Sequence, residues 1–248
     1  MGGMDTSCAI NMAGVVDGAG GLASDAGELS FDHEARYGLA FSGGCDSSYL
    51  LAAMVRAGVD VKAYMVKTAF QADFEVDDAR RVVEETGADF ELIEADVLSH
   101  EEICENPWDR CYHCKRFIFG TVLDCMAKDG RTVLVDGTNA SDDPARRPGF
   151  RALVELGVVS PLREAGLTKD DVRARSRAIG LSTADKPSFS CYATKVPERM
   201  RITQEGLARV ARELGHVGGC GDEAGVRAES NEQTECNSSA QNGQAERR

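Results

Sequence analysis

Six residues near the start of the chain have the chemistry to bind the phosphates of a nucleotide. The run Ser42-Gly43-Gly44-Cys45-Asp46-Ser47 follows apolar residues 37–41 and precedes apolar residues at helical spacing. This pattern predicts a strand, a glycine turn and a helix. Two glycines let the backbone curl with its N–H groups pointing inward, and the helix dipole adds attraction for an anion. The hydroxyls of Ser42 and Ser47 supply further donors, and Asp46 is suited to coordinate magnesium or water.

Three cysteines form a second group with chemical potential. Cys111 and Cys114 make a Cys-x-x-Cys pair followed by a helical pattern, and Cys191 stands much later in the chain. The pair alone is compatible with half of a zinc site, iron–sulfur ligands, a redox pair or a structural role. Arg110 and Lys115 flank the pair, and their positive charges are expected to lower the pKa of the thiols.

These residues need a scaffold that brings distant loops together. Apolar runs suited to buried strands lie at 37–41, 61–66, 90–93 and 132–135, with helical patterns between them at 46–57, 75–86 and 112–127. We therefore predict an α/β fold, a parallel sheet flanked by helices with a smaller, mostly helical C-terminal part.

Two further features help to place the loops. Ligands of a parallel sheet bind beyond the carboxyl ends of its strands, which is where 42–47 and 136–139 fall. Later helices are expected near Thr168, which forms an approximate capping box with Asp171, and near Thr203.

Charge and hydropathy narrow the partners and the location. The 248-residue chain has a formal net charge of −13, which argues against a nucleic-acid partner bound through its phosphates. No apolar run approaches the ~18 residues that span a bilayer, and residues 1–21 lack the basic start of a signal peptide. We therefore expect no membrane contact and a cytoplasmic protein. In that reducing setting the nine cysteines are interpreted as free, metal-binding or catalytic rather than disulfide-bonded.

The loop at 42–47 resembles the pyrophosphate-binding loop of the PP-loop ATP-pyrophosphatases, which share an adenine nucleotide alpha hydrolase-like fold. Further segments resemble the LarE family of this superfamily, ATP-dependent sulfurtransferases that act on pyridinium-3,5-biscarboxylic acid mononucleotide to build the nickel-pincer nucleotide cofactor. These segments are 106–115, with the pattern Asn-Pro-x-x-Arg-Cys-Tyr-x-Cys-Lys, and 136–140, 147–153, 160–162, 166–169 and 185–191. The resemblance extends over about residues 37–203.

The resemblance implies a two-stage reaction that uses ATP and Mg²⁺. A carboxylate of the pyridinium dicarboxylate mononucleotide is adenylylated, and sulfur then displaces AMP to leave a thiocarboxylate. Some family members give up the sulfur of one cysteine in the position of Cys191. Others have three cysteines that hold a [4Fe-4S] cluster with an extra sulfide, and Cys111, Cys114 and Cys191 match that pattern, which we favour.

The resemblance also suggests roles for single residues. Gly137 and Thr138 join the loop in lining the nucleotide pocket, and Lys115 and Arg110 hold the phosphate or carboxylate of the substrate beside Cys191. Other candidates are open to a structural interpretation: Asp136 for magnesium, and Arg147, Arg151 and Lys195 for the anionic substrate. A homo-oligomer is expected by resemblance only.

Composition and resemblance together divide the chain. We predict a disordered acidic N-terminal segment (1–35), a PP-loop ATP-pyrophosphatase domain (36–145), a C-terminal substrate and sulfur-transfer region (146–214), and a disordered, atypical tail (215–248). Family members usually continue into an Arg-x-Arg strand and a His-Gly pair, which the tail does not carry.

Other functions remain open at this stage. The chain is alternatively a different PP-loop enzyme, either a tRNA thiolase or an amide-forming ligase. A tRNA thiolase is expected to carry a basic face, and a glutamine-dependent ligase needs a glutaminase unit. A third alternative is a protein that binds a nucleotide or cluster and has lost its activity.

Overall fold

A computed structural model describes residues 7–9, 27–144 and 147–216 of the chain. Its strands are β1 (Ser7–Ala9), β2 (Ser30–Asp32), β3 (Arg36–Ala40), β4 (Asp60–Lys67), β5 (Asp89–Glu94) and β6 (Val133–Asp136). Its helices are α1 (Cys45–Ala57), α2 (Asp73–Thr86), α3 (Glu101–Cys104), α4 (Arg110–Lys128), α5 (Phe150–Glu155), α6 (Pro161–Glu164), α7 (Lys169–Ala178) and α8 (Gln204–Glu213). The 3₁₀ turns η2 (Val97–Ser99) and η4 (Tyr192–Lys195) complete the elements used below.

Four parallel strands form the central sheet in the order β5-β4-β3-β6, which confirms the predicted α/β fold. Successive strands β3, β4 and β5 run outward in one direction, whereas β6 pairs with the other edge of β3. The chain therefore reverses direction across the sheet between β3 and β6. A crevice opens at such a switch point beyond the carboxyl ends of the strands, and it is the usual ligand site of an open α/β sheet.

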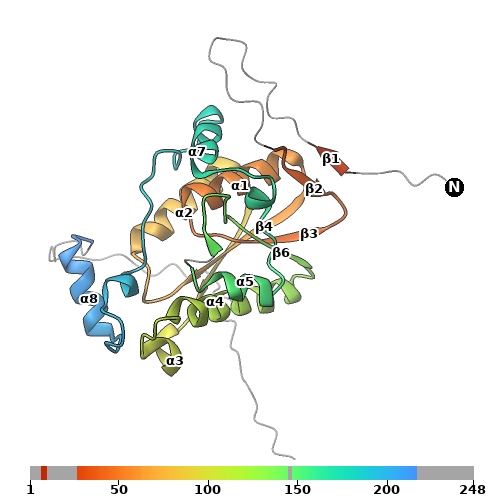
Figure 1. Cartoon of the computed structure of the whole chain (residues 1–248). Coiled ribbons are helices and arrows are strands. Elements are labelled where there is room, and N and C mark those ends of the chain that lie inside the picture. The colour runs from red at the N-terminus through yellow and green to blue at the C-terminus, as the bar shows by residue number, and fades with distance from the viewer. Residues whose placement is uncertain (1–6, 10–26, 145–146, 217–248) are drawn as a thin grey trace, which may run out of the picture. The chain divides into compact units, whose positions relative to one another are not determined.

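Helices cover both faces of this sheet (Figure 1). α1 packs against β3, β4, α2 and α7, while α4 packs against β3, β4 and α5. The apolar side chains fall into two clusters. The sheet core centres on side chains such as Leu39, Leu50 and Leu162. The cysteine-side core joins η2, α3, α4, η4 and α8 through Ile103, Cys114 and Tyr192 among others.

The later helices begin where capping residues predicted them. Thr168 accepts from the backbone N–H of Asp171 at 3.2 Å, and the reciprocal bond completes the capping box of α7. Thr203 accepts from the N–H of Gly206 at 3.1 Å at the start of α8. Short helices α5 and α6 were not predicted individually, because four to six residues carry too little periodicity.

The predicted ends of the chain differ in how far the structure reaches them. Leu29 and Phe31 are buried in the sheet core and β2 pairs with β1, so the segment 1–35 does not lack structure throughout. Two large apolar side chains are enough to anchor this short strand although the surrounding composition is acidic and small. The tail beyond His216 lies outside the described residues, and the domain boundaries stay predictions.

Candidate active site

The loop between β3 and α1 closes on itself through hydroxyl and amide donors. The Oγ atoms of Ser42 and Ser47 lie 3.2 Å apart, and the N–H of Gly44 donates to Ser42 Oγ at 3.4 Å. Ser47 Oγ also donates to the carbonyl of Gly44 at 3.2 Å. The polar atoms that the sequence assigned to phosphate binding therefore gather within one turn.

The N-terminus of α1 has no side chain capping it. Gly44, the N-cap residue, is extended and offers no cap hydrogen bond. The first N–H groups of a helix have no partner inside the helix, and their partial positive charge attracts anions. A phosphate placed at the switch point would meet these amides and the two serine hydroxyls together.

Two glycines allow the loop to approach its neighbours closely. Gly43 has a φ of +64°, and a Cβ there would lie 2.9 Å from the backbone of Ala79 on α2. A Cβ on Gly137, which follows β6, would lie 2.7 Å from the backbone nitrogen of Ser47. Gly137 thus packs against the start of α1, and Thr138 next to it is buried. The structure brings the predicted residues after β3 and after β6 together.

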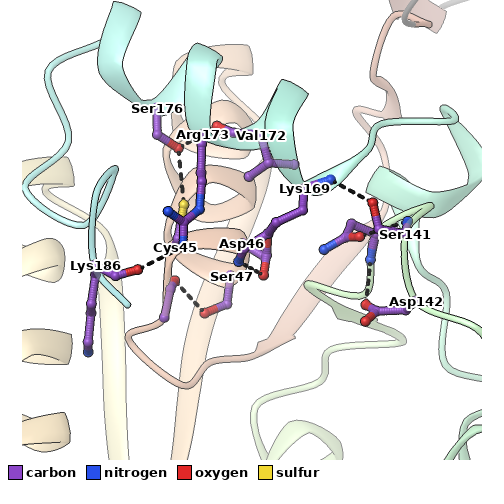
Figure 2. Close-up of polar contacts among 12 residues, drawn as sticks. Cys45, Asp46, Ser47, Ser141, Asp142, Lys169, Val172, Arg173, Ser176 and Lys186 are labelled. Carbon is purple, nitrogen blue, oxygen red and sulfur yellow. Dashed lines mark hydrogen bonds and ion pairs between the residues drawn. The ribbon is translucent and has the colours of Figure 1, made fainter. Parts of the chain in front are cut away.

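A lysine from the C-terminal part of the chain meets the loop, as Figure 2 shows. Lys169, the first residue of α7, contacts Asp46 Oδ2 at 2.5 Å, and its backbone N–H donates to Ser141 Oγ at 3.0 Å. The second carboxylate oxygen of Asp46, Oδ1, is buried without a hydrogen-bond partner among the described residues. Because hard cations bind carboxylate oxygens, this orphaned atom fits a magnesium ligand.

Asp136 is instead occupied by neighbouring side chains. Its carboxylate accepts from Thr138 Oγ1 at 2.5 Å and from Ser160 Oγ at 2.7 Å, and only 5% of the residue is exposed. The alternative of a strand-end structural role is therefore the better description of Asp136 than a magnesium ligand.

The three cysteines come from two segments of the chain, and the charge of Arg110 acts on the two that are more buried, Cys114 and Cys191. Arg110 is buried, and its Nη2 lies 3.5 Å from the sulfur of Cys111 in the first turn of α4. The charge of the same guanidinium acts on the thiol of Cys191, which stands immediately before η4. Cys114, one turn further along α4, is buried, and the charges of Arg110 and Cys191 both act on its thiol.

The thiol pKa values differ from the expectation. Burial raises the pKa of Cys114 to about 12 and also raises that of Cys191, although the Arg110 charge acts in the opposite direction on both. The lowering predicted for the Cys-x-x-Cys pair from its flanking basic residues is thus wrong in direction for Cys114. Burial depends on tertiary packing, which the flanking sequence does not report.

Within the described ranges, no group of three or more His, Cys, Asp or Glu side chains converges to hold a metal ion. A preformed site for a single zinc ion at the cysteines is therefore not present there. An iron–sulfur cluster has a different requirement, because each thiolate ligates a different iron and the donors stand apart. Ligation of an iron–sulfur cluster by Cys111, Cys114 and Cys191 therefore stays a prediction.

Lys115 of α4 is half-buried and follows Cys114 directly. Burial lowers the pKa of its ammonium group, and the carboxylate of Asp136 and the thiol of Cys111 both act to raise it. A Cβ on Gly149 would lie 2.7 Å from Lys115 Cδ, so the stem is tightly enclosed. No carboxylate of the described residues is within salt-bridge distance of its Nζ, which leaves the charge available to an anion.

The remaining basic candidates already have partners or lie on the surface. Arg147 pairs with Asp142 at 2.7 Å, and Arg151 pairs with Glu155 at 2.8 Å and stacks on Tyr112. Lys195 is exposed at the end of η4. None of these contacts assigns the three residues to substrate binding.

Two lysines that contact the loop were not assigned roles from the sequence. Lys169 holds Asp46, and Lys186 Nζ contacts the carbonyl oxygen of Gly43 at 3.0 Å and Asp78 at 2.7 Å. Both lie in segments that carry the family resemblance, 166–169 and 185–191, and that was their only signal. More than 120 residues separate each lysine from its loop contact, so local pattern could not identify them.

Comparisons with known proteins agree with this geometry. A family model described as asparagine synthase matches residues 24–121. The chain is 32% identical over 177 residues to pyridinium-3,5-bisthiocarboxylic acid mononucleotide synthase of Lactiplantibacillus plantarum, covering 71% of this chain and 64% of that protein. It is 33% identical to an uncharacterized protein of Synechocystis sp., covering 70% and 65% respectively. A tRNA-specific 2-thiouridylase of Thermotoga maritima is 25% identical over 61% of this chain and 54% of its own length. The chain thus spans somewhat less than two thirds of the first two relatives.

In the described residues, no helix is long and apolar enough to cross a membrane.

Proposed function

We propose that the chain is a PP-loop protein of the LarE type and that it transfers sulfur to a carboxylate of a pyridinium dicarboxylate mononucleotide at the expense of ATP. The observation that carries this proposal is Lys115, a half-buried lysine of α4 on which the charges of both Asp136, at the end of β6, and Cys111 act. It links the two halves that such a reaction needs. The name of the Lactiplantibacillus relative supports the substrate class.

In the first stage the PP-loop binds the β- and γ-phosphates of ATP. A carboxylate oxygen of the substrate attacks the α-phosphorus, the bond to the β-phosphate breaks, and pyrophosphate leaves. Asp46 would hold Mg²⁺, with Lys169 balancing its charge, while the α1 N-terminus and Ser42 and Ser47 stabilise the departing pyrophosphate. Lys115 is placed to neutralise the carboxylate or phosphate of the substrate.

In the second stage a sulfur nucleophile attacks the acyl carbon and AMP leaves with the oxygen. Cys111, Cys114 and Cys191 would hold a [4Fe-4S] cluster, and three protein ligands leave one iron to carry the sulfide that is transferred. The alternative source is Cys191 itself, whose Cβ–S bond would break and leave dehydroalanine. Arg110, which contacts Cys111 and whose charge acts on Cys191, would stabilise negative charge on either sulfur.

The test uses the full chain, reconstituted anaerobically with iron and sulfide, and pyridinium-3,5-biscarboxylic acid mononucleotide. We expect pyrophosphate release that depends on this substrate and a thiocarboxylate product. Absence of both would refute the proposal. C111A is expected to abolish repeated turnover, whereas C104A, which removes a buried cysteine of α3, is expected to retain it. If C111A still turns over once and leaves dehydroalanine at position 191, the sulfur comes from Cys191 and the cluster is excluded as its source.

A second candidate, tRNA thiolation, is favoured only by the similarity to the 2-thiouridylases. The net charge of −13 opposes it, because tRNA binding needs a basic face. Pyrophosphate release that depends on tRNA rather than on the pyridinium compound would establish this alternative.

A further inference from the structure

Trp108 is the only tryptophan of the chain, and 69% of its surface is exposed. Indole is a large apolar group that proteins usually bury or use at a binding surface. A single exposed aromatic side chain is not informative by itself. Trp108 is of interest because it stands three residues before Cys111.

The turn that carries Trp108 places it on the same side as Cys111. The N–H of Arg110 donates to the carbonyl of Pro107 at 2.9 Å, and the N–H of Tyr112 donates to that of Asp109 at 2.7 Å. Both are i→i+3 bonds, the pattern of a 3₁₀ turn, in which side chains three residues apart lie above one another. Consistent with this, Trp108 and Cys111 are exposed, whereas Arg110 and Tyr112 are buried.

The backbone just before Trp108 is fixed to the segment that follows Cys191. Asn106 is buried and has a φ of +52°, and its Nδ2 donates to the carbonyl of Pro197 at 2.8 Å. The N–H of Arg199 donates back to the carbonyl of Asn106 at 2.9 Å. The indole is therefore exposed on a backbone that is held in place beside both cysteine segments.

We propose that Trp108 is a stacking platform for the positively charged pyridinium ring of the substrate. The inference rests on the function proposed above and adds a specificity-determining residue to it. The face of an indole attracts cations more strongly than other aromatic faces. A flat cationic ring on Trp108 would lie next to the Cys111 side of the site. A neutral ring of the same shape would lose the electrostatic part of this attraction.

The experiment titrates the full chain with nicotinic acid mononucleotide, which carries a pyridinium ring, a carboxylate and a phosphate. Because Trp108 is the single tryptophan, its fluorescence reports contact directly. We expect quenching that saturates with the binding isotherm measured by calorimetry. W108A is expected to bind about 5- to 30-fold more weakly and W108F to recover most of the affinity. Uridine monophosphate, with a neutral ring, is expected to bind the wild type weakly and W108A equally weakly.

V154A provides the matched control, because Val154 of α5 is 80% exposed and also apolar. It is expected to bind as the wild type does. Unchanged affinity in W108A, with no quenching in the wild type, would overturn the platform. The two proposals fail separately. Pyrophosphate release with an unchanged KM in W108A refutes the platform alone, whereas Trp108-dependent binding without pyrophosphate release refutes the reaction alone.

Discussion

The nucleotide side and the cysteine side of this site are built in different ways. The loop at 42–47 is continuous in sequence, follows one strand and starts one helix, and its polar atoms bond to one another. Cys111 and Cys191 are 80 residues apart, and their segments are brought together by long-range contacts such as those between Asn106 and Pro197 and within the cysteine-side core. A local element is stable against changes elsewhere, whereas a site assembled from distant segments depends on every contact that holds those segments together.

The charged groups of the two sides also differ in whether they have partners. On the nucleotide side, Asp46 and Asp78 each have a lysine partner, Lys169 and Lys186. On the cysteine side, the buried guanidinium of Arg110 faces thiols whose pKa values are raised by burial. Paired charges make the first side rigid before a ligand arrives. The second side holds a cation whose anionic partner is supplied by deprotonation or by a ligand.

The largest expected effect comes from closing the space at the loop. G43A places a methyl group 2.9 Å from the backbone of Ala79 and forces alanine into a φ of +64°. We expect the Kd for ATP, measured by calorimetry, to rise on the order of 100-fold because the loop must move. G58A is the matched control, since Gly58 has a φ of +70° but open space around it. It is expected to lose about 1–2 kcal/mol of stability and to bind ATP normally. Equal ATP affinity in G43A and G58A would show that the close approach of the loop to Ala79 is not needed for ATP binding.

The next effect separates function from stability at Lys115. Burial lowers the pKa of Lys115, so below that lowered value the folded chain holds a charge that opposes folding. K115M is expected to raise the denaturation midpoint at pH 7 while lowering kcat/KM for pyrophosphate release on the order of 100-fold. The stability gain is expected to shrink as the pH rises through the lowered folded pKa towards the ordinary value of about 10.5.

Lys62 gives the opposite sign and serves as the control. Burial acts to lower its pKa, but ion pairs with Asp129 and Glu91 outweigh this and raise it. K62M is expected to lower the midpoint at pH 7, with normal catalysis. That loss should vanish as the pH rises past about 10.5 through the raised folded pKa. If the denaturation midpoints of K115M and K62M changed with pH in the same direction, the two lysines would not differ as described.

The sequence predicted the nucleotide side better than the cysteine side, for a physical reason. A strand, two glycines and a helix follow one another within the run that ends at Ser47, so local periodicity and turn chemistry were sufficient. The pKa shift of Cys114 was predicted in the wrong direction because packing around this thiol buries it. Lys169 escaped assignment because its contact with Asp46 joins α7 to α1, a pairing that no local pattern encodes.

A smaller effect is expected at the contact that joins the two cysteine segments. The side chain of Asn106 donates to the carbonyl of Pro197, and its φ is +52°. N106A removes the donor to the partly buried carbonyls of Val196 and Pro197 and puts alanine in a left-handed conformation, at a cost of about 2–3 kcal/mol. We expect thiocarboxylate formation to fall while the Kd for ATP is unchanged. N106G keeps the backbone conformation but not the hydrogen bonds, so a normal N106G would assign the effect to backbone strain alone.

The smallest expected effects come from the two helix caps, which test the comparison with matched changes. Thr168 caps α7, whose first residue is Lys169, and Thr203 caps α8 in the cysteine-side core. Each Thr→Ala change removes a cap and is expected to cost about 1 kcal/mol in chemical denaturation. Because α7 supplies the partner of Asp46, T168A is expected to weaken ATP binding by a few-fold, whereas T203A leaves it unchanged and slows only sulfur transfer. If both variants weakened ATP binding equally, the two sides would be one mechanical unit, and the thiols could not be assembled or lost independently of the nucleotide site.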